Sequence, residues 1–212
     1  MTLMHPPKAR PEFQTRHPGR RMTEEEFVDW IGEKTRAEWV DGEIIMTAPV
    51  SLDHDGICWL VRSVVQLFAE YHRLGTVYGS EVMVRLPRQR RLTDVSFVST
   101  SRVEILKPNH VDAPPDLAME VVSPDSIKRD WRDKFAAYRR AKVREYWIID
   151  PLQSCMEAHV LTRSATYRQI PETKAGIAST VLPGFRLKSD WVFANPRPSV
   201  LKILKELGIA LS

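Results

Sequence analysis

The chain has 212 residues, of which 43% are hydrophobic, and this is enough for one sizeable core. Lysine and arginine number 31 against 27 aspartates and glutamates, so the formal charge of +4 permits an anionic partner such as nucleic acid without requiring one. No apolar run reaches the length of a membrane span, and the two cysteines have no disulfide or zinc-binding spacing, so we expect a cytoplasmic protein without a membrane partner, a disulfide framework or a zinc site.

The N-terminal segment is basic and rich in proline. Residues 1–22 contain no apolar leader, and we expect them to form a flexible tail before a single domain at 23–212. The stretch TEEEFVDWI predicts a helix at the start of that domain. Thr23 is a favourable N-cap, and Glu26, three residues later, completes a capping box.

A hairpin and a long helix follow. The stretch AEWVDGEIIMTAP predicts two strands that turn at Asp41 and Gly42. The stretch DHDGICWLVRSVVQLFAEYH predicts an amphipathic helix that is capped by Asp53 or Asp55. Its apolar face is expected to contain Ile57, Leu60, Val61, Val64, Val65, Leu67 and Phe68.

The rest of the chain mixes strands with two more helices. Alternating or apolar runs predict strands within 75–87, 93–99, 117–122 and 144–150, a helix at 129–141, further strands within 154–187 and a terminal helix within 198–211. The order predicts a mixed α/β (α+β) fold with one strand–helix–strand crossover at 116–150.

A glutamate lies at the centre of an apolar strand, in the stretch PPDLAMEVVSPDS. Alternation along the strand points Glu120 away from Met119 and Val121. A buried carboxylate is costly, so Glu120 needs a partner or a metal ion. Asp94 opens the preceding predicted strand, and if the two strands are neighbours the two carboxylates converge in a way that suits Mg²⁺ or Mn²⁺.

A lysine on the following helix can complete this group. Trp131, Phe135 and Tyr138 define the buried stripe of that helix. Lys134 lies at the border of the stripe, from which its side chain can reach Glu120. Two carboxylates, a divalent cation and a lysine suffice for phosphodiester hydrolysis. Spacing alone nevertheless favours the simpler interpretation, a structural ion pair.

Four stretches together resemble the Uma2 family, also called DUF820: AEWVDGEIIMTAP, TDVSFVS, PPDLAMEVVSPDS and KRDWRDKFAAYRRAKVREYWIIDP. The resemblance covers roughly residues 23–190. It implies the restriction-endonuclease-like fold of the PD-(D/E)XK superfamily, with a core mixed sheet flanked by helices. It also implies a divalent-metal site, endonuclease activity on DNA and a homodimer.

The resemblance assigns roles to individual residues. Asp94 matches the first strand acid of the family, and Glu120 matches the acid of the (D/E)XK element. Val122 occupies the place where the superfamily usually has its lysine, which makes Lys134 on the following helix the match for that lysine. The backbone carbonyl of Val121 would be a further metal ligand.

Three further residues, Thr93, His54 and Glu81, bear on this assignment. Thr93 precedes the first acid where the family commonly has proline, which weakens the motif slightly. His54 matches a histidine that the family often carries, and it is a candidate proton shuttle or phosphate contact, although a plain helix-start residue is the simpler interpretation. Glu81 is a candidate outer metal ligand, with an exposed strand residue as the simpler interpretation.

The basic stretch RLPRQRR lies just upstream of the first acid, separated from it by Leu92 and Thr93. Its residues Arg88, Arg90 and Arg91 are candidate contacts to a nucleic-acid backbone that they would steer to the site. Each basic cluster taken alone is more often a solvated surface.

These observations predict a Mg²⁺- or Mn²⁺-dependent endonuclease in which Asp94 and Glu120 bind the metal and Lys134 orients the attacking water. The alternative is a catalytically silent nuclease-fold module that serves as a scaffold for nucleic acid or protein. A metal-dependent phosphohydrolase that acts on something other than DNA is a third hypothesis.

Overall fold

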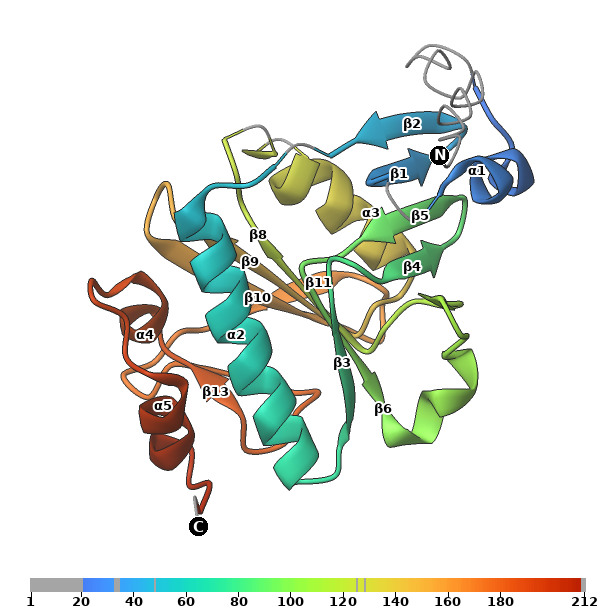
Figure 1. Ribbon diagram of the computed structural model, residues 1–212. Coiled ribbons are helices and arrows are strands. Elements are labelled where there is room, and N and C mark those ends of the chain that lie inside the picture. The colour runs from blue at the N-terminus through green and yellow to red at the C-terminus, as the bar shows by residue number, and fades with distance from the viewer. Residues whose placement is uncertain (1–20, 33–34, 48, 125, 128, 211–212) are drawn as a thin grey trace, which may run out of the picture.

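The strand that carries Glu120 lies inside a six-stranded sheet, in the order β11-β10-β9-β8-β6-β3 (Figure 1). The computed structural model describes residues 21–32, 35–47, 49–124, 126–127 and 129–210. The strands of this sheet are β3 (Gly75–Gly79), β6 (Val95–Ser99), β8 (Leu117–Val121), β9 (Glu145–Asp150), β10 (Cys155–Leu161) and β11 (Tyr167–Ile170). The pair β8–β9 is parallel and the other pairs are antiparallel, so the mixed sheet and the predicted crossover are confirmed.

The pairing of β6 with β8 brings the two acidic residues of the predicted site together. Val95 is the register partner of Met119. Asp94 directly precedes Val95 and Glu120 directly follows Met119, so the two acids come to the same end of this antiparallel pair. The two strands are therefore neighbours, as the predicted convergence of Asp94 and Glu120 requires.

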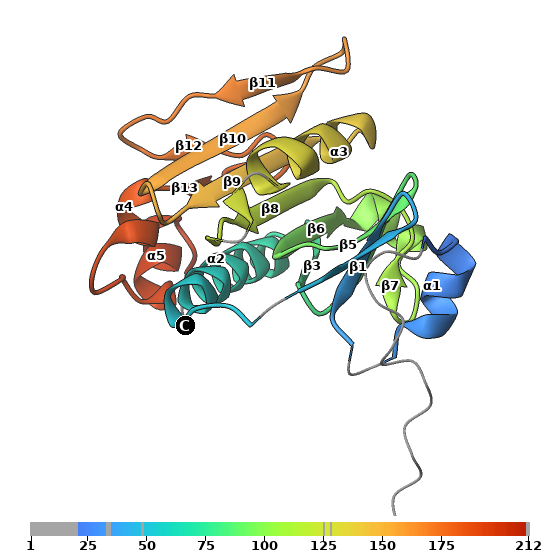
Figure 2. The same ribbon diagram turned by 90° about the horizontal axis from the view of Figure 1, so that it is seen from above.

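Helices cover both faces of the sheet (Figure 2). The long helix α2 (Leu52–Tyr71) packs in one apolar cluster with Leu117 and Met119 of β8. The short helix α3 (Phe135–Arg140) packs Tyr138 in a second cluster with Ala118 and Val122. The alternation predicted for the glutamate strand is thus confirmed, since its odd and even residues enter different clusters.

Two details of α2 differ from expectation. Leu67 is 40% exposed, because it lies beyond the edge of the stripe that the other six predicted residues bury. The N-cap is Ser51, whose hydroxyl accepts a hydrogen bond from the backbone N–H of His54 at 3.2 Å, and neither Asp53 nor Asp55 has this role.

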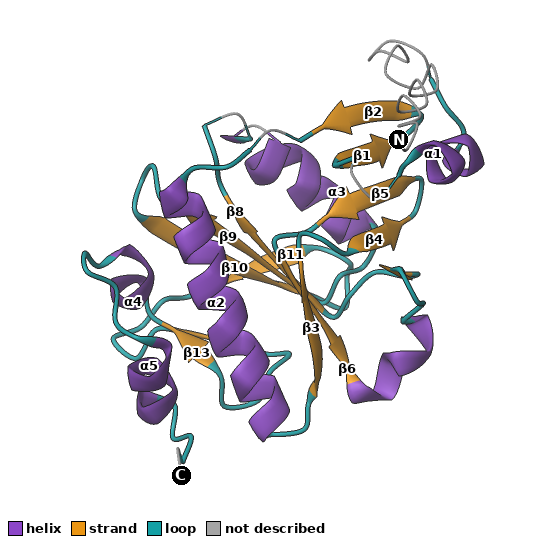
Figure 3. Cartoon of the chain, viewed as in Figure 1, coloured by secondary structure: helices purple, strands orange, loops and turns teal. Residues whose placement is uncertain are grey.

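A second sheet of five strands lies beside the first, in the order β2-β1-β5-β4-β7 (Figure 3). It contains β1 (Ala37–Val40), β2 (Glu43–Met46), β4 (Met83–Leu86), β5 (Gln89–Leu92) and β7 (His110–Val111). The predicted hairpin is confirmed, and its turn residues Asp41 and Gly42 both have positive φ. The helix α1 (Glu24–Trp30) begins with the predicted capping box between Thr23 and Glu26.

Several short elements were not predicted from the sequence. A 3₁₀ segment (Thr100–Ile105) and the two-residue strand β7 follow β6, and α4 (Ser189–Phe193) precedes the terminal helix α5 (Val200–Glu206). The strands predicted within 154–187 are present as β10, β11, β12 (Ile177–Ala178) and β13 (Arg186–Leu187). The 3₁₀ segment, β7 and α4 are short and lack a clear apolar period, so the sequence pattern did not identify them.

The expected tail lies almost wholly outside the described residues. Met22, which was assigned to it, is buried, and its N–H donates to the carbonyl of Gly42 at 2.8 Å. The folded part therefore includes this residue. Among the described helices, none combines the length and the apolar character that crossing a membrane requires.

Candidate active site

Asp94 links the two central strands. It directly precedes β6, and its Oδ2 accepts a hydrogen bond from the backbone N–H of Val121 at 2.9 Å. This contact fixes the carboxylate at the end of β8, beside the residue that follows Glu120.

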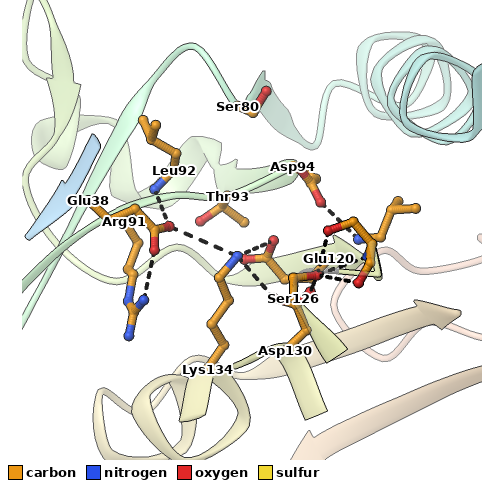
Figure 4. A network of polar contacts seen from close by, with 12 residues as sticks. Glu38, Ser80, Arg91, Leu92, Thr93, Asp94, Glu120, Ser126, Asp130 and Lys134 are labelled. Carbon is orange, nitrogen blue, oxygen red and sulfur yellow. Dashed lines mark hydrogen bonds and ion pairs between the residues drawn. The ribbon is translucent and has the colours of Figure 1, made fainter. Parts of the chain in front are cut away.

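Glu120 is fully buried, and both of its carboxylate oxygens accept hydrogen bonds. Figure 4 shows Glu120 together with Lys134 and Asp130. Oε2 accepts from Nζ of Lys134 at 2.8 Å, and Oε1 accepts from the hydroxyl of Tyr138 at 2.6 Å. The hydroxyl of Thr93 lies 2.7 Å from that of Tyr138. Because the tyrosine donates its proton to Glu120, Thr93 is the donor in this second bond. Thr93, which stands where the family commonly has proline, thus donates a hydrogen bond to Tyr138, the partner of Glu120.

An irregular helix positions Lys134. Residues Arg129–Lys134 are π-helical and α3 continues from Phe135, whereas the sequence predicted one regular helix. The wider turn buries Asp130 as well as Lys134, and Oδ1 of Asp130 lies 3.3 Å from the lysine amine. Ser126 donates to the other carboxylate oxygen of Asp130. Such π-helical turns are frequent at functional sites.

A second buried ion pair adjoins the lysine. Glu38 on β1 contacts Nη1 of Arg91 through Oε2 at 2.8 Å, and both side chains are 3% exposed. Its Oε1 lies 3.9 Å from Nζ of Lys134 and accepts from the backbone N–H of Leu92 at 3.0 Å. The lysine therefore lies between carboxylates from both sheets.

Burial and neighbouring charges shift the pKa values of Glu120, Asp94 and Lys134. Burial, reinforced by the charges of Asp94 and Asp130 and opposed by Lys134, raises the pKa of Glu120 to about 8. Burial also raises the pKa of Asp94, against the opposing charges of Lys134 and His54. For Lys134, burial alone would lower the pKa, but the surrounding carboxylates, led by Glu120, raise it well above its usual value. The lysine stays protonated, and Glu120 is the member of the pair that gains a proton as the pH falls.

The local charge favours a divalent cation. The carboxylates of Glu38, Asp94, Glu120 and Asp130 act on Lys134, and Glu38 is also paired with Arg91. These four carboxylates outnumber the lysine and the arginine that pair with them. A cavity of about 190 Å³ is lined by Asp94, Asp130 and Lys134, and Glu120 is not at its surface. Carboxylate oxygens and a nearby backbone carbonyl are donors that fit Mg²⁺ or Mn²⁺.

His54 belongs to the same neighbourhood, although a plain helix-start residue was the simpler expectation. Its Nε2 atom lies 2.8 Å from the carbonyl oxygen of Val121 and 3.7 Å from Oδ2 of Asp94. The carbonyl expected to bind metal is therefore already hydrogen-bonded to this ring. Nδ1 of His54 lies 3.5 Å from Sγ of Cys58, a neighbour that the sequence analysis did not connect with the site.

The other predicted residues are more dispersed. Glu81 is exposed in a turn, where it forms an ion pair with Arg36 and lines a cavity that also contains Asp94. Arg88 is 80% exposed beside Asp41, whereas Arg90 contacts Glu24 at 2.8 Å. Arg90 and Arg91 are thus themselves buried and paired with carboxylates, and of the three arginines only Arg88 presents its charge to solvent.

Sequence reasoning missed three groups that complete the network: Glu38, Asp130 and the hydroxyl of Tyr138. Asp130 had a recognisable signal, since it lies four residues before Lys134 in the same helix. Tyr138 was assigned to the apolar stripe, and only the structure shows that its hydroxyl reaches Glu120. Glu38 lies on a strand of the other sheet, and no local pattern connects it with Lys134.

Comparison with known proteins agrees with the fold. The model of the Uma2 family, described as "Putative restriction endonuclease", matches residues 24–190. The crystal structure of a protein from Anabaena variabilis, described as a "putative nuclease belonging to DUF820", superposes with a TM-score of 0.68 at 18% sequence identity. That alignment covers 81% of this chain and 97% of the other. No curated protein matches the sequence.

Proposed function

Because the chain belongs to the Uma2 family, a family of restriction-endonuclease-like nucleases by description, we propose that it is a divalent-metal-dependent endonuclease that hydrolyses DNA. The observation that carries the proposal is the meeting of three predicted residues from three elements. Asp94 is bonded to the end of the glutamate strand, and Lys134 lies 2.8 Å from Glu120.

Asp94 and Glu120 are the residues that would hold Mg²⁺ or Mn²⁺, with the carbonyl of Val121 as a third donor. The excess of buried carboxylates supports this assignment, because a dication removes their mutual repulsion. A divalent cation bound there supplies Lewis-acid polarisation of a phosphate and a more acidic bound water.

Lys134 has an electrostatic role in this proposal. Its raised pKa keeps the amine protonated, so it can stabilise negative charge or orient a water molecule but cannot accept a proton. Asp130 and Glu120 hold the amine from two sides, at 3.3 and 2.8 Å. Tyr138 in turn holds the second oxygen of Glu120, which restricts the rotation of the carboxylate.

The proposed substrate approaches over an arginine-bearing surface. Arg88 is exposed, and Arg36 lines both the cavity with Lys134 and the adjoining one with Glu81. Exposed guanidinium groups suit the phosphate backbone of DNA. The family resemblance further implies a homodimer, and the composition of the sequence leads us to expect a cytoplasmic location. Both are part of the proposal.

The experiment measures DNA cleavage and DNA binding on the same preparations. Wild-type protein should nick plasmid DNA with Mg²⁺ or Mn²⁺ and stop when EDTA is added. Asp94→Asn should lose cleavage by at least about a hundredfold, as expected when a metal ligand is removed. Lys202→Ala, a change of an exposed lysine on the distant helix α5, is the matched control for a charge change and should cleave normally.

The rival scaffold hypothesis gives a different pattern. It predicts salt-dependent DNA binding that neither EDTA nor Asp94→Asn abolishes, with no cleavage under any condition. A panel of small phosphodiesters tests the third hypothesis, because a general phosphohydrolase would cleave them and leave plasmid DNA intact. Either pattern would refute the proposed function.

A further inference from the structure

A second set of possible metal ligands lies next to the proposed nuclease site. His54 and Cys58 are four residues apart on α2, so they project from the same side of the helix. An imidazole nitrogen of His54, the sulfur of Cys58 and a carboxylate oxygen of Asp94 all lie within 4.8 Å of one another. The set combines nitrogen, sulfur and oxygen donors, whereas the nuclease site offers oxygen alone.

The ring of His54 is held in the orientation of a metal ligand. Its Nε2 lies 2.8 Å from the carbonyl oxygen of Val121, and a carbonyl can only accept, so Nε2 carries a proton. In the neutral ring Nδ1 then carries the lone pair, and this atom is the hydrogen-bond partner of the Cys58 thiol. Metal-binding histidines almost always donate their other ring N–H to such a carbonyl or carboxylate, which fixes the tautomer.

The separation of the two donors on α2 also matches a metal site. Ligands about 2.0–2.3 Å from a tetrahedral zinc ion lie about 3.5 Å from one another. Nδ1 of His54 and Sγ of Cys58 are 3.5 Å apart. A carboxylate oxygen of Asp94 belongs to the same group of donor atoms within 4.8 Å, and three protein ligands leave one position for water, as in catalytic zinc sites.

The surroundings of these three residues have room for an ion. A cavity of about 640 Å³ is lined by His54, Cys58 and Asp94 together. The second cysteine, Cys155 on β10, belongs to no such group among the described residues.

We propose that His54, Cys58 and Asp94 form a transition-metal site that takes a borderline ion such as Zn²⁺ or Co²⁺ in preference to Mg²⁺. Imidazole and thiolate ligands favour Zn²⁺ and its neighbours in the first transition row, whereas Mg²⁺ requires oxygen ligands. This site goes beyond the proposed nuclease function and shares only Asp94 with it.

The test is a Co²⁺ titration of the metal-free full chain in the presence of a phosphine reductant. A thiolate bound to Co²⁺ gives a charge-transfer absorption in the near ultraviolet that oxygen and nitrogen ligands do not give. We expect this band to saturate at one Co²⁺ per chain, to disappear on addition of Zn²⁺ and to persist in a large excess of Mg²⁺. Cys58→Ser should abolish the band and weaken Co²⁺ binding at least about tenfold, while Cys155→Ser, the matched control, should retain both.

Two further variants separate this site from the nuclease site. His54→Gln should weaken the band, because it removes the nitrogen ligand and leaves the thiol. Glu120→Gln should retain the band although the proposed function predicts that it loses cleavage, so the two proposals can fail independently. The metal-site proposal is overturned if saturating Co²⁺ gives no thiolate band, if the band survives in Cys58→Ser, or if Mg²⁺ displaces Co²⁺ at equal concentration.

Discussion

Nζ of Lys134 lies 2.8 Å from Oε2 of Glu120, although the two residues belong to a helix and a strand and Val122 fills the motif's usual lysine position. Both side chains are almost completely inaccessible to solvent. Removing either partner would leave a buried charge with less compensation, so this contact has consequences for stability as well as for the proposed chemistry.

Replacing the lysine alone should be destabilising. Lys134→Met leaves the carboxylates of Glu120 and Asp130 facing an apolar side chain, and we expect the free energy of unfolding to fall by about 3–5 kcal/mol at pH 8. Urea denaturation monitored by circular dichroism measures this loss. A fall of less than 1 kcal/mol would show that the pair contributes little.

The double variant separates structure from catalysis. Lys134→Met combined with Glu120→Gln removes both charges. We expect the double variant to recover a large part of the lost free energy of unfolding, because burying a neutral pair costs less free energy than burying one unpaired charge. Cleavage should remain absent in spite of the recovered fold. Restored cleavage in the double variant would contradict a catalytic role for these residues.

Stability without metal should depend on the protonation of Glu120. Its pKa rises from a usual 4.5 to about 8 in the folded state, so the folded protein binds this proton more tightly than the unfolded chain does. The contribution to stability is therefore complete below pH 4.5 and is lost as the pH rises to about 8, by at most about 1.4 kcal/mol per pH unit. Urea midpoints in EDTA between pH 5 and 9 test this, with Glu120→Gln as the control that lacks the dependence.

The affinity for a divalent cation should have the opposite pH dependence. The cation and the proton compete for Glu120, so Mn²⁺ affinity should rise up to about tenfold per pH unit and level off above about pH 8. Isothermal titration calorimetry from pH 6 to 9 measures the dependence. A flat profile would show that Glu120 does not ionise when the metal binds.

Two arginines of the basic stretch, Arg88 and Arg91, should behave differently from each other. Arg88→Ala should weaken DNA binding and reduce the salt slope by about 0.9, without a change in stability, because its side chain is exposed. Arg91→Ala should instead destabilise the fold, because it leaves Glu38 buried with one cationic partner fewer. Fluorescence anisotropy at several salt concentrations, together with thermal unfolding, distinguishes the two effects.

Local patterns predicted the elements that determine the architecture. The capping box at Thr23 and the Asp41–Gly42 turn are encoded within a few residues, and the apolar spacing of α2 identified six of its buried side chains. The position of Lys134 at the edge of its stripe was also sufficient to place its amine near Glu120.

What the sequence did not predict depends on irregular geometry or on distant pairing. A uniform turn of about 100° per residue cannot anticipate the π-helical segment, and so the burial of Asp130 was missed. Arg91 was interpreted as part of an exposed basic loop, but β5 pairs with both β1 and β4 and turns its side chain toward Glu38. His54 and Cys58 were not recognised as possible ligands because Asp94, the third residue of the group, is distant from them in the sequence.

The most direct test of the nuclease proposal is plasmid cleavage by wild-type protein and Glu120→Gln across one Mn²⁺ series at pH 8, with DNA binding measured in parallel. The substitution removes one charge and leaves the size of the side chain unchanged. We predict metal-dependent nicking by the wild type and none by the variant at equal DNA affinity. Equal cleavage by both proteins, or cleavage by neither at any Mn²⁺ concentration, would contradict the assignment of this site.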